Sequence, residues 1–186
     1  PLRQLAERFE QLLLVDIDAA ALAESVKQVG LEPKLHARLS LVQTDVTGVN
    51  DVFLQRARAA LALTNEVEVY AGLLRLLYDY RVDEPPRLLP ESEAGRPLDF
   101  ACSSMVLSQL ATPLTQYVEE RFAARFPASQ RTQGLEFQVA LGQFTHRVQH
   151  AHVRSLLAAA PCVALSSDFS ARYTGLDPHG AEVVGE

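Results

Sequence analysis

The sequence predicts an α/β fold built on a doubly wound, mostly parallel sheet. Short apolar runs alternate with stretches of helical period, most clearly where runs at 12–15 and 39–42 flank a helical segment. Strand, helix and strand within about thirty residues form a βαβ unit, and parallel strands require such crossovers. Acids or serines follow the runs, and ligands of these sheets bind at the carboxyl ends of the strands. We therefore expect functional residues at the strand ends.

Local signals place the elements of the first half. Apolar residues at helical spacing predict a helix over 2–9. The run Leu12–Val15, closed by Asp16, predicts a strand buried on both faces. Asp18 can cap the following helix, which ends at Gly30. Apolar period predicts two further elements, a strand at 39–42 and a helical region from Asp51 to Tyr80.

Prolines divide the second half. Residues 83–97 contain prolines and a glycine and predict a mobile loop. Thr112 and Pro113 resemble a helix N-cap followed by proline at the first helical position, and Pro127 ends that helix. The remaining predicted elements are strands at 98–103 and 162–165 and a long helix from about Leu135 to Ala160.

Composition narrows the classes of function. The formal net charge is −6 and the basic residues are scattered, which argues against DNA and favours a small-molecule substrate. No run approaches the ~20 apolar residues of a membrane span, and no signal segment is recognisable. Only two cysteines occur, Cys102 and Cys162, and we expect small buried side chains in a reducing cytoplasm. The start at Pro1 rather than Met suggests a processed or trimmed chain.

Asp16 is the first candidate binding residue. A carboxylate after a strand of a nucleotide-binding sheet accepts hydrogen bonds from both hydroxyls of a ribose. An acid in this place can instead cap the next helix. We favour the binding role for Asp16 and the capping role for Asp18.

Four segments extend this interpretation: LLLVDIDAAAL, LSLVQTDV, LDFACSSMVLSQL and CVALSSDF. In order and spacing they resemble the second to fifth strand motifs of the class I S-adenosylmethionine-dependent methyltransferases, a Rossmann-like family. The resemblance covers roughly residues 2–168. It implies a single methyltransferase-like domain over 1–186, incomplete at its amino terminus. Enlarged helical parts would lie at 50–97, an insertion and loop, and at 112–160, before the last strand.

The resemblance also implies S-adenosylmethionine as cofactor and a set of residues that hold it. Asp16 would bind ribose, and Ile17 would contact adenine. Asp45, with Val46 beside it in the same motif, would receive the adenine amino group. Three residues of the fourth-strand motif would line the methionine moiety and face the methyl acceptor: Ser103, Ser104 and Met105.

Two departures from the family pattern stand out. The family's glycine-rich turn follows its first strand, and neither lies within this sequence. In the family's sheet that strand lies centrally, so we expect a strand between those ending at Asp16 and Ser103, supplied by residues upstream of Pro1 or by a second chain. The connection from Asp45 to Leu98 is also longer than one crossover helix requires. The family uses such insertions as lids or as contacts in homo-oligomers.

The fourth-strand motif bears on the acceptor. Amino-methyltransferases that act on DNA bases have an acidic or amide residue, two prolines and an aromatic there, whereas this chain has Cys102-Ser103-Ser104-Met105. Methyl transfer to a small-molecule or other non-DNA acceptor is therefore favoured. The cofactor is already activated, so no catalytic base is required. Asp168 is the weak candidate if the acceptor must lose a proton, although a loop acid is the simpler interpretation.

Other residues suggest sites less strongly. His146 and His150 share a helix face, but no acid or cysteine stands at ligand spacing, so we expect solvated histidines and no metal. His152 is expected to point elsewhere on that helix. Tyr70, Tyr78 and Tyr80 could line a substrate, but core and rim positions are more common for such a set.

Two other functions remain open on the sequence. A catalytically silent relative would use its helical insertions as an interaction surface. A nicotinamide-dependent oxidoreductase would share the acid after the second strand. Asp45 and the Ser-Ser-Met stretch weigh against the oxidoreductase. Fold alone does not decide among them.

Overall fold

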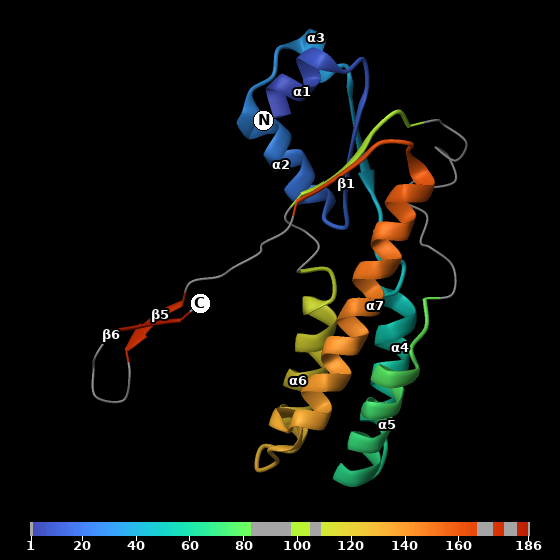
Figure 1. Cartoon of the computed structure of the whole chain (residues 1–186), viewed down its shortest axis with the longest axis vertical. Coiled ribbons are helices and arrows are strands. Elements are labelled where there is room, and N and C mark those ends of the chain that lie inside the picture. Colours follow the sequence, from blue (N-terminus) through green and yellow to red (C-terminus); the bar gives the residue numbers. More distant parts are fainter. Residues whose placement is uncertain (1, 83–97, 105–108, 167–172, 177–181, 186) are drawn as a thin grey trace.

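Four of the predicted strands form two separate parallel pairs in the computed structural model, which describes residues 2–82, 98–104, 109–166, 173–176 and 182–185 (Figure 1). β1 (Leu12–Asp16) pairs with β2 (Leu39–Gln43), and β3 (Ala101–Ser104) pairs with β4 (Val163–Ser166). Within the described residues these pairs are two-stranded sheets and do not join into one. A continuous doubly wound sheet therefore stays a prediction.

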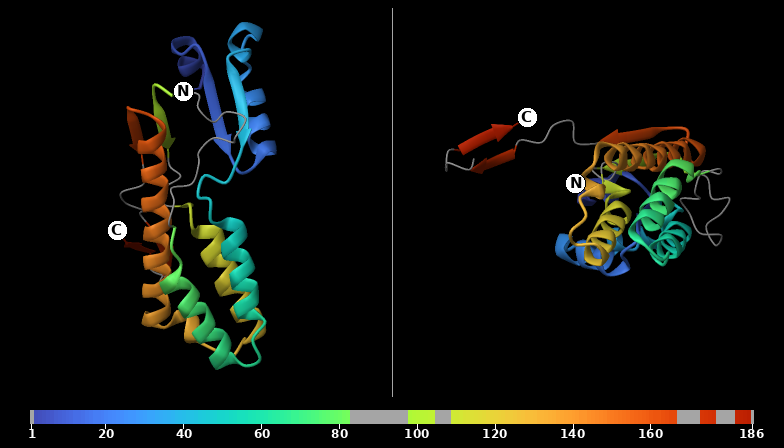
Figure 2. Two further views of the ribbon diagram at one scale, coloured as in Figure 1. Left: turned by 90° about the vertical axis from the view of Figure 1, so that its right-hand side faces the viewer. Right: turned by 90° about the horizontal axis from the view of Figure 1, so that it is seen from below.

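β1 and β3 are the inner strands of the two pairs. In the left view of Figure 2, β1 and β3 face each other, with β2 and β4 on the outside. The amino ends of the inner strands are linked by the rings of Phe9 and Phe100, which stack with their centroids 6.1 Å apart. The inner strands thus lie near each other at one end without pairing.

The first pair is covered by a helix whose ends agree with the prediction. α2 (Ala19–Val29) contacts both β1 and β2. The Asp18 carboxylate accepts hydrogen bonds from the amides of Ala20 and Ala21, and Gly30 ends the helix in the left-handed conformation at φ 58°. Two shorter helices lie beside this unit, α1 (Leu2–Arg8) and α3 (Pro33–His36).

The other helices form a bundle beyond the strand pairs (Figure 1). The longest of these helices, α7 (Leu135–Ala159), ends just before β4. The bundle core is aromatic, with Phe53 and Phe144 stacked at a centroid distance of 4.4 Å and both fully buried. The bundle helices are α4 (Asn50–Leu61), α5 (Glu66–Asp79), α6 (Thr112–Arg125) and α7 (Leu135–Ala159), with a 3₁₀ turn, η3 (Arg131–Gln133), before the last.

Several local predictions need correction. The helical region from Asp51 to Tyr80 is two helices, because Asn65 ends the turn after α4 and caps α5 by accepting from the Glu68 amide. Thr112, predicted as the cap, is the first residue of α6, and the cap position is Ala111, so the helix begins one residue earlier than predicted. β1 is half-buried along Leu12–Val15 and not buried on both faces, since it belongs to a sheet of two strands.

A hairpin near the carboxyl end was not predicted. β5 (Tyr173–Leu176) and β6 (Glu182–Gly185) pair antiparallel. Figure 1 shows this hairpin apart from the strand pairs and the bundle. The predicted loop at 83–97 lies outside the described residues, as do Met105 and Asp168.

Candidate functional site

The carboxyl end of β1 presents Asp16 and Ile17 together. The Asp16 side chain is exposed, and its Oδ1 accepts a hydrogen bond from the Asp18 amide at 3.0 Å, while Oδ2 has no partner among the described residues. The Ile17 side chain is 53% exposed beside it. The side-chain amide of Gln43, at the neighbouring end of β2, donates to the Ile17 carbonyl oxygen at 3.1 Å and holds this turn to the second strand. An acceptor and an apolar side chain therefore share one open edge.

Asp16 and Asp18 divide the two roles that the sequence left to them. Asp18 caps α2, as expected. Asp16 accepts no hydrogen bond from the amides of α2 and keeps one carboxylate oxygen open. The arrangement is compatible with hydrogen bonding of Asp16 to a ligand's hydroxyl groups.

Asp45 is engaged in the start of α4. Its Oδ1 accepts from the amide of Thr47 at 2.9 Å and from the Thr47 hydroxyl at 2.5 Å, and its Oδ2 accepts from the Asn50 amide at 3.0 Å. The carboxylate is half-buried. Because a carboxylate oxygen can accept two hydrogen bonds, Oδ2 retains capacity for one more donor. Asp45 therefore has a structural role whatever else it binds.

His152 joins the loop after β2 to β3, and the sequence did not predict this. Its Nε2 lies 3.0 Å from the Ser103 hydroxyl, and its Nδ1 lies 3.4 Å from the carbonyl oxygen of Val46. His152 is 3% exposed and Ser103 is 5% exposed. Since a carbonyl oxygen only accepts, Nδ1 carries the proton and Nε2 accepts from the Ser103 hydroxyl. Three segments distant in sequence, around 46, 103 and 152, thus meet at one ring.

Burial keeps the His152 imidazole neutral. Loss of solvation lowers its pKa below the ordinary 6.5, and the hydrogen bond to the Val46 carbonyl opposes that shift only in part. A serine and a neutral histidine at this distance resemble a nucleophile and its base. The burial of Ser103, however, leaves its hydroxyl out of reach of a substrate carbonyl. The contact therefore fixes the position of β3 against α7.

His152 points away from the face that carries His146 and His150, as expected, and its spacing places it in the core. Phe144, Val148 and His152 recur every four residues and form one buried stripe of α7. His146 and His150 lie on the exposed face, with their rings stacked 6.3 Å apart. Within the described part of the chain, no three His, Cys, Asp or Glu residues are grouped so that they could hold a metal ion.

The predicted cysteine burial is also wrong, since Cys102 and Cys162 are both free and exposed. Side chains alternate along a strand, so Cys102 points away from the face on which Ser103 meets α7. The tyrosines, by contrast, occupy core and rim. Tyr80 is buried against Phe53, and the hydroxyls of Tyr70 and Tyr78 both donate to Glu136.

The structure therefore assembles part of the predicted site. Asp16 and Ile17 lie together at the end of β1. Val46 and Ser103 meet through His152, and Asp45 precedes Val46 directly. Ser104 ends β3 in register with Ser166 of β4.

Comparison with known proteins identifies no relative. No helix in the described residues has the length and apolar character needed to span a membrane. No protein-family model, no curated protein and no solved structure matches the chain.

Proposed function

We propose that this chain is part of an S-adenosylmethionine-dependent methyltransferase that acts in the cytoplasm on a small-molecule or other non-DNA acceptor. The main support is the arrangement of the strand ends. Two parallel pairs lie with β1 and β3 innermost, in the order β2, β1, β3, β4 (Figure 2). The inner strands end in polar residues, Asp16 and Ser104, at the edge where ligands of parallel sheets bind.

The residues at the end of β1 fit the nucleoside part of the cofactor. Asp16 offers an open carboxylate oxygen for the ribose hydroxyls, and the exposed Ile17 offers an apolar surface for adenine. Asp45 fits in part, because its carboxylate already accepts from Thr47 and from the Asn50 amide and has capacity for one further donor. In this proposal Ser104 and Met105 line the methionine side together with the backbone of Ser103, whose side chain is turned toward His152.

When bound, the cofactor supplies an activated methyl group on a sulfonium. The chain's own contribution is then orientation. Asp16 would fix the ribose by charge-assisted hydrogen bonds, and Ile17 would contact the base. His152 would keep the strand that carries Ser103 at a fixed position, since its ring holds β3 and the Val46 loop at once.

Replacement of Asp16 tests the proposal. In protein that includes the residues upstream of Pro1, we expect Asp16→Ala to weaken S-adenosylmethionine binding by about 1.5–3 kcal/mol, measured by calorimetry. Asp18→Ala is the matched control. It removes the cap of α2 and about 1 kcal/mol of stability, but no contact to the cofactor.

The two variants separate the possible results. Loss of affinity in Asp16→Ala alone supports the cofactor role. Equal loss in both variants would assign the effect to local unfolding of the β1–α2 turn, and unchanged affinity in both would remove Asp16 from the site. Titration with NADH in place of S-adenosylmethionine tests the oxidoreductase alternative with the same proteins.

A further inference from the structure

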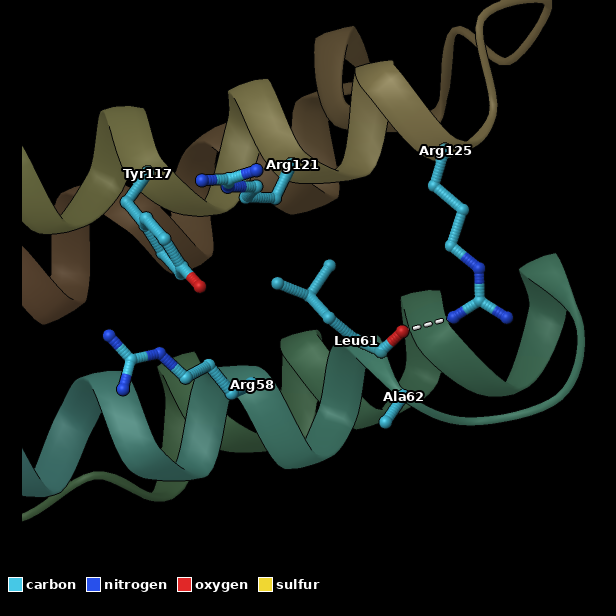
Figure 3. Close-up of a pocket in the computed structure, with 6 residues that line it drawn as sticks. All are labelled: Arg58, Leu61, Ala62, Tyr117, Arg121 and Arg125. Atoms are coloured by element: carbon cyan, nitrogen blue, oxygen red, sulfur yellow. Dashed lines mark hydrogen bonds between the residues drawn. The ribbon is translucent and has the colours of Figure 1, made fainter.

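A groove between α4 and α6 gathers three arginines. Its volume is about 290 Å³ and it is open to solvent. Figure 3 shows Arg58 on the α4 side and Tyr117 and Arg121 on the α6 side, with Leu61 between them. We call this the arginine groove; its lining residues are Arg58, Leu61, Ala62, Tyr117, Arg121 and Arg125.

The charge of the arginine groove is opposite to that of the chain. The protein has a formal net charge of −6, yet no carboxylate lines the groove. Neither Arg58 nor Arg121 forms an ion pair with any described residue. Arg58 and Arg121 reach the groove from opposite helices, and no lining residue supplies a counter-charge, so both attract an anion that enters it.

Arg125 has a structural task in the same groove. Its guanidinium donates to the carbonyl oxygen of Leu61, the last residue of α4 (Figure 3), and to those of Leu63 and Thr64 in the turn that follows. Carbonyl oxygens at a helix end and in the turn after it carry partial negative charge, which would otherwise disfavour an anion here. Because Arg125 neutralises them, Arg58 and Arg121 remain available to a ligand.

Tyr117 restricts Arg121 and adds an apolar surface. The Arg121 guanidinium carbon lies 5.5 Å from the centre of the Tyr117 ring, a cation–π contact that limits the freedom of the long side chain. A partly fixed guanidinium loses less entropy when it binds an oxyanion through two parallel hydrogen bonds. Leu61, Ala62 and the Tyr117 ring offer contact area to an apolar group beside the anion.

We propose that the arginine groove binds a phosphate monoester whose organic group is apolar or aromatic. The phosphoryl oxygens lie between Arg58 and Arg121, and the organic group lies on Leu61 and Tyr117. The Asn50 amide, at the start of α4, donates to Asp45. Arg58 lies eight residues further along the same helix, a distance of about 12 Å at about 1.5 Å per residue. The groove is therefore separate from the strand ends proposed to hold the cofactor.

Titration with phenyl phosphate and with inorganic phosphate tests this site. On the intact chain at constant ionic strength, NMR of the arginine side-chain N–H groups should show shifts at Arg58 and Arg121. Phenyl phosphate should bind more tightly than inorganic phosphate. Arg58→Gln and Arg121→Gln should each weaken phenyl phosphate binding about tenfold. Arg75→Gln, on the exposed surface of α5, is the matched control and should leave it unchanged.

Three results would overturn the proposal. One is shifts of Arg75 equal to those of Arg58, which indicate general screening. Another is affinity unchanged in both groove variants while their thermal unfolding matches the parent protein. The third is equal affinity for the two phosphates, which removes the apolar contact from the site.

Arg58→Lys keeps the charge but loses the paired hydrogen bonds, so it should bind phenyl phosphate with an affinity between those of the parent protein and Arg58→Gln.

Discussion

His152 shows how one side chain links parts of this molecule that its sequence keeps apart. Its ring is buried between α7, β3 and the loop after β2, and both nitrogens have partners. A buried imidazole that is protonated in place carries a charge without solvation, and the Ser103 hydroxyl must change from donor to acceptor. The protonation state of His152 should therefore influence folding stability.

We expect the unfolding free energy to fall with acidification, in part through His152. Burial lowers the folded-state pKa below 6.5, so the unfolded chain binds the proton more readily. The stability contributed by the neutral ring is complete above about pH 6.5 and is lost as pH falls through the lowered folded-state pKa. Urea unfolding at a series of pH values from about 7.5 to 5 measures this slope.

Two variants test whether His152 causes this dependence of the unfolding free energy on pH. His152→Gln should flatten it, because the titrating group is gone from both states. His146→Gln removes an exposed histidine of the same helix and should leave the slope as it is. The same slope in His152→Gln and in the parent protein would show that His152 does not titrate on unfolding.

Residues whose role is local were predictable, and those with distant partners were not. Asp18 caps the helix that begins beside it, so its role follows from its immediate neighbours in sequence. His152 bonds to Ser103 and Val46, which lie 49 and 106 residues away. Its place on the Phe144–Val148 stripe indicated burial, but nothing in the sequence indicated those partners.

Among the elements, α5 and α7 offer a comparison of two helical glycines. A methyl group at Gly72 would lie 3.1 Å from Leu63 Cδ1 and 3.3 Å from Ala60 Cβ, whereas at Gly142 it would meet nothing within 4 Å. Glycine costs a helix interior about 0.8–1 kcal/mol relative to alanine. At Gly72 the absence of a side chain lets α5 pack closely on α4, which offsets that cost.

We expect Gly142→Ala to raise the unfolding free energy by about 0.5–1 kcal/mol. Gly72→Ala should gain less or lose stability, because Ala60 and Leu63 must move to admit the methyl group. Chemical denaturation of both variants measures the difference. An equal gain at the two positions would mean that α4 and α5 pack less closely than the structure has them.

Periodicity predicted the elements better than their ends. β1, β2, α2 and α7 follow from apolar spacing, caps and prolines, which act within a few residues. The turn at 62–65 was missed because its residues, Ala62-Leu63-Thr64-Asn65, contain no proline or glycine. The β5–β6 hairpin was missed because short strands give a weak pattern.

At the scale of the whole molecule, the bundle and the strand pairs differ in burial. The bundle core contains fully buried aromatic side chains. Most residues of β1, β2 and β4 are half-buried or exposed, and Leu41 of β2 and Leu165 of β4 are each 45% exposed. Apolar side chains on open strands favour a neighbour that would cover them.

The backbone of the inner strands leads to the last prediction. The Leu12 amide donates to Arg38 and the Asp16 carbonyl accepts from Thr44, so Leu12, Leu14 and Asp16 bond toward β2. In a parallel ladder alternate residues bond to opposite sides, so Leu13 and Val15 direct their amides toward β3. On β3, the backbone of Ala101 bonds toward β4, so the backbone amide and carbonyl of Cys102 are directed toward β1.

We predict that a parallel strand, supplied upstream of Pro1 or less favourably by a second chain, fills the space between β1 and β3. Backbone groups left unpaired there would cost roughly 1–3 kcal/mol each if buried, a large part of the about 5–15 kcal/mol that stabilises a domain. Hydrogen exchange should show fast amides at Leu13, Val15 and Cys102 in the 186-residue chain and slow ones once the upstream residues are added. The Leu14 amide, which bonds to β2 in either case, is the control. Direct hydrogen bonds between β1 and β3 would contradict both this prediction and the methyltransferase proposal.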